Sequence, residues 1–356
     1  MDGRFEEQSE LLGTHTNCIY AMSSDVFKFR PVSVVPLRAF MFSAGTWSEL
    51  VFPVTQKIVR IGSSKCETDI LIEDQSIAPV QLVLRRIGRR WFVFDSGETP
   101  LALFNGFKKR QAALDEGMKI FIELGGIVFL FCVGEQGIAP VPEAGQSVKN
   151  SFKLSFDGSR AEFSFAFQAL IGLDALCDIN VGNSAFYALV FYEQNGGFYL
   201  YSPFGCGDGP ANSSGEKYLN LRDGTIFMAG EENIIFNSDF GAHYPPGALL
   251  MKDTTRSSLV LVELDDMDNV VNKLMLPDKG RSLFVGRNPG NYFMIGGRKI
   301  SKKHAQIMTG AANICVIDNS STNGTYVNGE RIEKKVVGLG DSIGFGDRFF
   351  ILTCAE

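Results

Sequence analysis

The sequence has little of what proton-transfer or metal-dependent catalysis requires. Its 356 residues include only three histidines, and none of its seven cysteines forms a Cys-x-x-Cys pair. Histidine is the side chain that most readily transfers protons near neutral pH, and closely spaced cysteines and histidines are the usual signature of a zinc site. We therefore expect no catalytic residue, no metal and no cofactor in this chain.

Long apolar runs are also missing. No stretch approaches the roughly 20 apolar residues of a membrane-spanning helix. The first thirty residues carry Glu6, Glu7 and Glu10 and lack the apolar segment of a signal peptide. The cysteines are scattered and odd in number, as is usual for proteins of a reducing compartment. These features predict a soluble, cytoplasmic protein with no membrane span.

A strongly basic region is absent as well. The formal net charge of the chain is −6. Residues 251–356 hold 14 Lys and Arg against 12 Asp and Glu, so this part carries +2 and the remainder −8. Nucleic-acid binders present a much more basic surface. We expect no nucleic-acid partner, and we expect the C-terminal third to be the part that best tolerates an anion.

Glycine and phenylalanine are abundant instead. The chain has 38 Gly and 30 Phe, 45% hydrophobic residues and 21% charged residues, which is enough apolar material for packed cores. Many short segments show the two-residue alternation of β-strands, such as residues 91–94 and 198–201, and no long segment shows a helical period. At roughly 100–200 residues per domain, the length allows two or three domains. The predicted fold class is all-β.

Three short blocks near the C-terminus carry the chemistry. The segment 318–325 reads Asp-Asn-Ser-Ser-Thr-Asn-Gly-Thr, and it follows Gly286-Arg287 and the tetrapeptide Ser-Lys-Lys-His at 301–304. Arginine offers a rigid fork of donors that suits phosphate, and Ser, Thr and Asn add short polar donors. None of these residues forms a nucleophile–base pair. The blocks indicate a site that holds a phosphate without transferring it.

Together the three blocks resemble the signature of the forkhead-associated (FHA) domain, a β-sandwich that binds phosphothreonine peptides. The resemblance implies that Arg287 and Ser301 contact the phosphate, and that Lys302 adds charge or a backbone contact. It also implies that Thr322 assists on the phosphothreonine side and that Asn323 holds the peptide backbone. The remaining signature residues would be structural: Gly286, His304, Asp318 and Gly324.

The same module is expected three times. A strand ending in glycine recurs at Gly62, Gly172 and Gly286, and later glycines keep similar spacing at Gly117, Gly224 and Gly340. Residues 95–106 also mirror the loop at 318–329, with Thr99 over Thr322 and one Asn-Gly pair over another. An Asn-Gly pair between two strands is the signal of a type I′ hairpin. The sequence thus predicts three tandem FHA-like β-sandwich domains.

The linkers and repeats give the expected boundaries. Polar or Pro/Gly-rich segments are typical of tails and linkers. We expect a flexible tail at 1–32, a degenerate FHA-like domain at 33–135, a linker at 136–147, a second degenerate domain at 148–238, a linker at 239–253, and an FHA domain with an intact motif at 254–356.

The first two repeats lack most of the binding residues. The alignment puts Ser63 of the first repeat at the arginine position, Pro79 at the histidine and Pro100 at the asparagine, and it keeps Ser76 and Thr99. The second repeat keeps only Ser184; it has Leu173, Tyr187, Cys206 and Gly207 at the arginine, histidine, threonine and asparagine positions. Residues 173–216 contain five carboxylates and no Lys or Arg, so a phosphate would meet uncompensated repulsion. We expect both repeats to serve as scaffold or protein-contact modules.

The leading interpretation is a phosphothreonine-dependent adaptor whose partner is a phosphothreonine-containing protein, such as a Ser/Thr kinase or its substrate. The alternative is a structural FHA-like component of a larger cytoplasmic assembly, for example secretion machinery, with no phosphopeptide dependence. An enzyme is disfavoured, because the glycine-rich stretch 205–209 lacks the Lys-Ser/Thr of a P-loop and the helix that would follow it.

Overall fold

A computed structural model describes most of the chain after residue 35. The described residues are 36–43, 46–53, 55–87, 90–134, 151–158, 162–165, 168–172, 177–181, 187–193, 197–206, 217–238, 258–265, 270–277, 280–310 and 313–355. The predicted tail at 1–32 and the predicted linkers at 136–147 and 239–253 lie outside them, as do Leu173, Ser184 and Gly207. The described ranges contain no helix that is long and apolar enough to cross a membrane.

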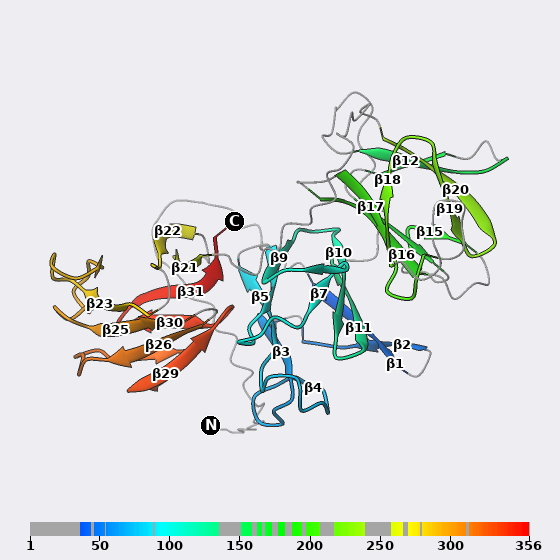
Figure 1. Cartoon of the computed structure of the whole chain (residues 1–356). Helices are drawn as coiled ribbons and strands as arrows, with labels where there is room; N and C mark the ends of the chain where they lie inside the picture. Colours follow the sequence, from blue (N-terminus) through cyan, green and yellow to red (C-terminus); the bar gives the residue numbers. More distant parts are fainter. Residues whose placement is uncertain are drawn as a thin grey trace, which may run out of the picture. The chain divides into compact units, whose positions relative to one another are not determined.

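The all-β prediction is confirmed: in the described ranges every regular element is a β-strand. The strands form six sheets, and these pair into three sandwiches, each with its own apolar core (Figure 1). Side chains along each strand alternate between the core and the outer face, because successive residues of a strand point to opposite sides of a sheet.

The first sandwich pairs a six-stranded sheet (order β2-β1-β11-β10-β7-β8) with a five-stranded sheet (β4-β3-β5-β6-β9). Its core includes Leu84, Val93 and Phe129. The strands are β1 Leu37–Ser43, β2 Thr46–Leu50, β3 Ile58–Gly62, β4 Ile70–Leu71, β5 Leu82–Ile87, β6 Arg90–Asp95, β7 Leu103–Phe104, β8 Phe107–Lys108, β9 Gln111–Leu114, β10 Lys119–Leu124 and β11 Ile127–Val133.

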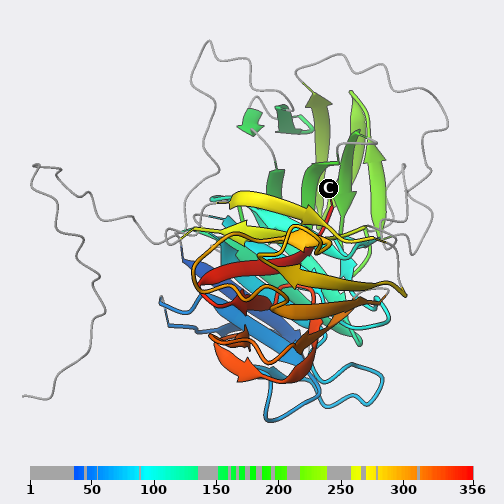
Figure 2. The same cartoon turned by 90° about the vertical axis from the view of Figure 1, so that its left-hand side faces the viewer.

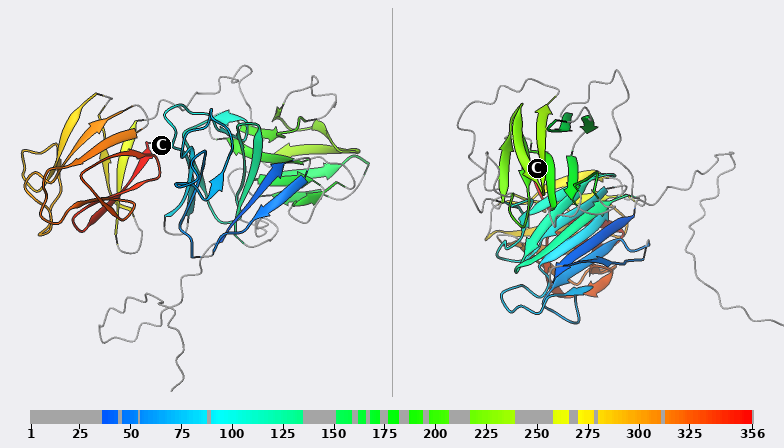
Figure 3. Two further views of the ribbon diagram at one scale, coloured as in Figure 1. Left: turned by 90° about the horizontal axis from the view of Figure 1, so that it is seen from below. Right: turned by 90° about the vertical axis from the view of Figure 1, so that its right-hand side faces the viewer.

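The second sandwich pairs a four-stranded sheet (β13-β12-β20-β19) with a five-stranded sheet (β15-β14-β16-β17-β18) (Figure 3, green). Phe152, Val190 and Phe236 lie in its core. The strands are β12 Phe152–Phe156, β13 Glu162–Phe165, β14 Gln168–Gly172, β15 Ile179–Asn180, β16 Tyr187–Glu193, β17 Gly197–Tyr201, β18 Tyr218–Leu221, β19 Thr225–Ala229 and β20 Glu232–Ser238.

The third sandwich repeats the strand order of the first, with sheets β22-β21-β31-β30-β27-β28 and β24-β23-β25-β26-β29 (Figure 2, yellow to red). Ile307, Val316 and Phe350 lie in its core. The strands are β21 Leu259–Leu264, β22 Val270–Met275, β23 Ser282–Gly286, β24 Phe293–Met294, β25 Ala305–Thr309, β26 Asn313–Asp318, β27 Thr325–Val327, β28 Glu330–Ile332, β29 Lys334–Gly338, β30 Ser342–Phe345 and β31 Arg348–Cys354.

The predicted Asn-Gly hairpins are present at both positions. Asn105 and Gly106 have φ angles of 48° and 81°, and Asn328 and Gly329 have 54° and 86°. Two successive positive φ angles define the type I′ turn that joins twisted antiparallel strands. Each asparagine side chain also accepts a backbone N–H from a neighbouring strand, that of Phe121 in the first sandwich and that of Ser342 in the third.

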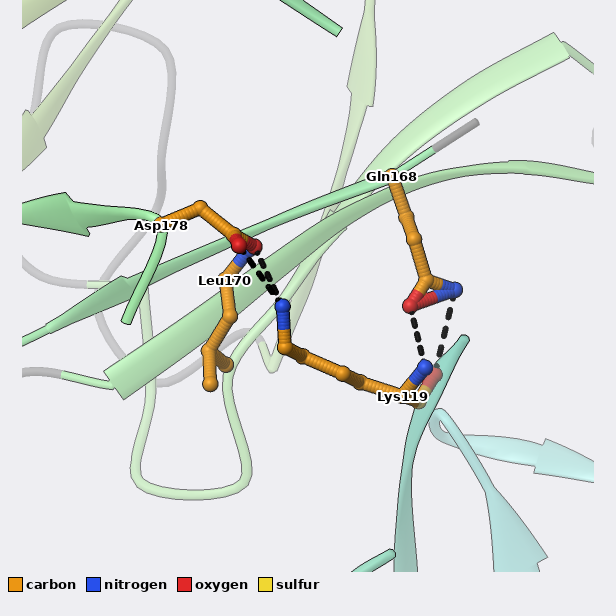
Figure 4. Close-up of polar contacts among 4 residues, drawn as sticks. All are labelled: Lys119, Gln168, Leu170 and Asp178. Atoms are coloured by element: carbon orange, nitrogen blue, oxygen red, sulfur yellow. Dashed lines mark hydrogen bonds and ion pairs between the residues drawn. The ribbon is translucent and has the colours of Figure 1, made fainter. Parts of the chain in front are cut away.

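The first and second sandwiches share an apolar interface. The outer face of the first six-stranded sheet packs on the outer face of the second five-stranded sheet through Phe121, Leu130, Tyr187, Leu189 and other buried side chains. Polar contacts frame it (Figure 4). Lys119 pairs with Asp178 at 2.7 Å, and the amide of Gln168 bonds both backbone groups of Lys119. These two sandwiches therefore cover apolar faces that each would expose alone.

Candidate functional site

The site is built around Gly286 at the end of β23. A Cβ at this position would lie 2.6–2.8 Å from backbone atoms of Ser301, Lys302 and His304, so only glycine fits there without displacing the backbone. The close approach allows the N–H of Arg287 to donate to the Ser301 carbonyl at 3.0 Å. It therefore joins the arginine segment to the serine segment at one end of the sandwich.

His304 joins this pair to the signature loop. Its imidazole is fully buried. Nδ1 accepts the backbone N–H of Ser301 at 3.1 Å, which leaves the proton on Nε2, and Nε2 lies 3.0 Å from the Gly324 carbonyl that accepts it. Both ring nitrogens are thus engaged inside the protein, and the histidine supports the loops from beneath.

Asp318 closes the signature loop from within. Its carboxylate accepts the hydroxyls of Ser321 and Thr325, both at 2.6 Å, and the Ser321 backbone N–H at 2.9 Å. Partial burial raises the pKa of Asp318, and these hydrogen bonds lower it. Together the hydrogen bonds outweigh the burial, so the pKa of Asp318 lies below its usual value. An ionised aspartate therefore stabilises the loop that carries Thr322 and Asn323.

The exposed end of the loop carries Thr322 and Asn323. The N–H of Thr322 donates to the Ser301 hydroxyl at 3.2 Å, so the serine and threonine segments are in direct contact. The Asn323 amide donates to the Lys299 carbonyl at 2.9 Å, and its side chain stays exposed. Backbone and short polar contacts thus hold Arg287, Ser301 and Thr322 beside one another.

The surroundings of the site are cationic. Residues 279–317 contain seven Lys and Arg and no Asp or Glu. Arg287 and Lys302 are exposed, and neither side chain forms an ion pair or hydrogen bond with the residues that the structure describes. Lys303, in contrast, lies 4.9 Å above the ring of Phe284. Arg287 and Lys302 are therefore two cations beside the serine and threonine segments that are available to an incoming anion.

The equivalent loops of the first sandwich correct one part of the sequence alignment. The N–H of Ser63 donates to the Ala78 carbonyl, just as the N–H of Arg287 donates to that of Ser301. The N–H of Gln81 donates to the Ile61 carbonyl, just as the N–H of His304 donates to that of Val285. Ala78 therefore occupies the serine position, and Gln81 the histidine position. The assignment of Ser76 and Pro79 to these positions was wrong by two residues, and the Ser76 hydroxyl instead bonds Asp74.

Gln81 reproduces the hydrogen bonds of the histidine. Its Oε1 accepts the N–H of Ala78 at 3.0 Å, and its Nε2 donates to the Thr99 carbonyl and to the buried carboxylate of Asp95. Sequence analysis did not identify Gln81. The signal for it was a polar residue immediately before the apolar strand β5, which is the place that His304 takes before β25.

A buried arginine is a further difference between the first sandwich and the third. Arg110 donates to the carbonyls of Gly97 and Glu98, so it holds the loop from below. Burial lowers the pKa of Arg110 and raises that of the neighbouring Asp95. The guanidinium of Arg110 therefore donates to backbone carbonyls inside the first sandwich and is not available to a ligand. At the position where the third sandwich has the exposed Arg287, the first sandwich has Ser63.

The second sandwich uses its equivalent positions for packing. Tyr187 is the first residue of β16 and pairs with Gly172 of β14, which places it at the histidine position as the alignment predicted. Both Tyr187 and Cys206 are buried. The ring of Tyr187 contacts Trp47 of the first sandwich with centroids 5.6 Å apart. These residues therefore contribute to apolar packing.

A cleft of about 520 Å³ lies elsewhere, between the first and third sandwiches. Its lining mixes the cations Arg60 and Lys335 with the carboxylates Glu67, Glu98 and Glu330. None of the predicted phosphopeptide residues lines it. The candidate site therefore lies apart from this cleft, on loops whose Arg287, Lys302, Thr322 and Asn323 are exposed.

Comparison with known proteins identifies the third sandwich. Residues 283–346 match the family model of the FHA domain. This segment is a β-sandwich that matches the FHA domain, and it contains every residue of the candidate site.

Individual relatives match parts of the chain. A 131-residue stretch, 35% of this chain, is 27% identical to the glycogen accumulation regulator GarA of Mycolicibacterium smegmatis and covers 82% of it. A 65-residue stretch, 17% of this chain, is 37% identical to the serine/threonine-protein kinase RAD53 of Saccharomyces cerevisiae and covers only 8% of that protein. Among solved structures, the FHA domain of CT664 from Chlamydia trachomatis is 25% identical, with 28% of this chain and all of that chain covered and a TM-score of 0.26.

Proposed function

We propose that this protein is a phosphothreonine-dependent adaptor whose third sandwich binds a phosphothreonine peptide. One observation carries the proposal: Arg287 and Lys302 are exposed and without a partner among the described residues, on loops that the buried His304 holds in place. Arg287, Ser301 and Lys302 would hold the phosphate, Thr322 would assist, and Asn323 would hold the peptide backbone.

Charge explains why such a site would select phosphate. A phosphate ester carries about −1.5 to −2 charges at neutral pH, more than any side-chain carboxylate. Charge-assisted hydrogen bonds to it are shorter and roughly twice as strong as neutral ones. The seven cations and no carboxylates of residues 279–317 favour this dianion over an Asp or Glu.

The first two sandwiches would serve as scaffold and contact modules without phosphopeptide binding. Ser63 replaces the exposed arginine in the first, and Tyr187 and Cys206 are buried in the second. We place the three domains at 33–135, 148–238 and 254–356, with linkers at 136–147 and 239–253. We further propose that the whole chain is not an enzyme, that it acts in the cytoplasm, and that its partner is a phosphorylated Ser/Thr kinase or a substrate of one.

A degenerate phosphothreonine peptide library, presented to the intact protein, tests the proposal. Recovery of a sequence family that binds only when phosphorylated is the expected result. The same library would be presented to the Arg287→Ala variant as the control. Equal recovery of phosphorylated and unphosphorylated peptides by the intact protein would exclude the proposed function.

The alternative, a structural component without phosphopeptide dependence, has one observation in its favour. The first and second sandwiches are joined by an apolar interface that includes Phe107, Phe191 and Tyr199. Such an interface suits a rigid scaffold. The alternative gives no reason for the exposed Arg287. The library screen distinguishes the two functions, because only the adaptor should bind peptides in a phosphate-dependent way.

A further inference from the structure

The three sandwiches are joined in series, in the order second, first, third. We call the outer face of each five-stranded sheet the front face of its sandwich, and the outer face of the other sheet the back face. The front face of the second sandwich packs on the back face of the first. The front face of the first sandwich contacts the third, because Val83 and Phe94 are buried in the core cluster of the third sandwich and Gln111 bonds Thr353 of β31.

This series leaves one face unused at each of its ends. The back face of the third sandwich is used, because Thr353 lies on it and its neighbours Val260 and Ile351 are buried. The front face of the third sandwich and the back face of the second belong to neither interface. They are the two faces through which the series could continue into another copy of the chain.

Strand register identifies the residues on the front face of the third sandwich. In the second sandwich, Leu170 on β14, Phe191 on β16 and Tyr201 on β17 are buried in the interface with the first sandwich. When both sandwiches are counted from their histidine positions, the equivalent residues of the third are Phe284, Met308 and Ile317. Both sets are largely apolar, so the third sandwich carries the same kind of contact surface as the second.

Most of this third front face is exposed. Phe284, Met308 and Val336 are 37%, 46% and 61% exposed. At one margin of the face Asn313 bonds Glu98 of the first sandwich at 3.3 Å, and the three apolar side chains lie beyond that contact. Contiguous exposed apolar residues on one sheet mark an interaction surface more often than scattered ones do.

The back face of the second sandwich carries the matching positions. In the first sandwich Phe121 and Leu130 pair across β10 and β11 and are buried in the interface with the second. Ile226 and Ile235 pair across β19 and β20 at the same distance from the hairpin turn. Ile226 is 37% exposed and Ile235 is half-buried. The second sandwich therefore presents to solvent the apolar pair that the first sandwich buries.

The two unused faces also differ in charge. Residues 254–356 hold 13 Lys and Arg against 11 Asp and Glu, a balance of +2, whereas residues 148–238 hold 5 against 10, a balance of −5. Locally, the exposed Lys334 pairs with Ile317 on the front face of the third sandwich. The exposed Glu231 and Glu232 lie at the β19–β20 turn beside the back face of the second. Opposite charges of this kind orient an association.

We propose that the chain self-associates head to tail, with the front face of the third sandwich of one copy packed on the back face of the second sandwich of another. The contact repeats the one that joins the second sandwich to the first within a chain. It is heterologous, because two different surfaces meet, and such contacts produce rings or filaments. It uses none of the residues assigned to phosphopeptide binding.

Two variants test the proposal on the full-length protein. Met308→Glu places a negative charge on the front face, opposite the acidic second sandwich. Ile226→Lys places a positive charge on the back face, opposite the cationic third sandwich. Val51→Glu and Val51→Lys are the matched controls, because Val51 is 87% exposed on the first sandwich and lies on neither face. Sedimentation velocity over a concentration series measures association, and circular dichroism verifies folding.

The expected result is concentration-dependent association of the wild type and of both Val51 variants. The association constant of each face variant should be roughly ten-fold lower or less, because an unpaired charge is costly to bury in an apolar contact. A mixture of the two face variants should form a one-to-one dimer, because Met308→Glu retains the back face and Ile226→Lys retains the front face. A monomeric wild type, undiminished association of either face variant, or a mixture that stays monomeric would each overturn the proposal.

Discussion

Ser301 and His304 are joined by a hydrogen bond in which the Ser301 backbone N–H donates to Nδ1 of the imidazole at 3.1 Å. The first sandwich contains the same bond between Ala78 and the side-chain oxygen of Gln81, at 3.0 Å. Two chemically different side chains thus perform one structural task. The task is to hold the serine segment under the loop that follows β26 or β6.

His304→Gln is expected to retain more stability than His304→Ala. Glutamine supplies an acceptor and a donor, as Gln81 does, whereas alanine leaves buried backbone groups without partners at a cost of about 1–3 kcal/mol. Urea unfolding of both variants measures the difference. Equal losses for the two substitutions would show that the hydrogen bonds of the ring contribute nothing.

Arg287→Ala is expected to weaken phosphopeptide binding more than Lys302→Ala. A charge-assisted hydrogen bond to a desolvated phosphate is worth about 1.5–3 kcal/mol, whereas an exposed charge contributes about 0–1 kcal/mol. Both variants should melt like the wild type, because both side chains are exposed. Peptide titration by fluorescence anisotropy decides; a larger loss for Lys302→Ala would reverse the assignment of these two cations.

Gly286→Ala and Gly62→Ala are both expected to destabilise the protein. A Cβ would lie 2.6 Å from the Lys302 carbonyl oxygen in the first case and 2.3 Å from that of Pro79 in the second, so the backbone must shift. Gly296→Ala is the control, because nothing lies within 4 Å of its added Cβ. Thermal melts of the three variants test this, and a harmless Gly286→Ala would contradict the close approach seen here.

Acid should loosen the signature loop through Asp318. Because its pKa in the fold lies below the ordinary value of 3.8, ionised Asp318 stabilises the loop at neutral pH. That contribution is lost as the pH falls from the ordinary value through the folded one. Hydrogen exchange of residues 313–327 as a function of pH measures it. Asp318→Asn should exchange faster at neutral pH and show less further loss in acid; an unchanged acid profile would refute the role.

The sequence predicted the parts of the fold whose signals are local. Asp95 and Asp318 begin loops of equal length that end in Asn-Gly turns, and a turn of this type depends on its own two residues. The FHA blocks at Gly286, Ser301 and Asp318 are likewise short and contiguous in sequence.

The sequence did not predict the loop register of the first sandwich. Gln81 lies 19 residues after Gly62, whereas His304 lies 18 after Gly286. Alignment of Ser76 with Ser301 assigned Pro79 to the histidine position instead. The register is set by the pairing of Ile61 with Leu82 across β3 and β5, which is a contact in space. A repeat that has lost its motif residues offers no local mark of that pairing.

The sequence analysis also did not predict the interfaces between sandwiches, although the apolar residues on both faces of one strand indicate such an interface. Strand β17 is buried at every position, from Gly197 to Tyr201. A strand that is apolar on both faces indicates that both faces are covered. The alternation at residues 198–201 predicts a strand but not its second covering layer, because that layer comes from the first sandwich, far away in sequence.

Calorimetric titration of the intact protein tests the central claim most directly. One peptide recovered from the library would be prepared with phosphothreonine, phosphoserine and unmodified threonine at the same position. The account predicts a dissociation constant in the low micromolar range for phosphothreonine, about −8 kcal/mol, weaker binding of phosphoserine, and no binding of threonine. Arg287→Ala should weaken the binding of the phosphothreonine peptide by about 1.5–3 kcal/mol. Equal affinity for the phosphorylated and unmodified peptides, or wild-type affinity in Arg287→Ala, would contradict it.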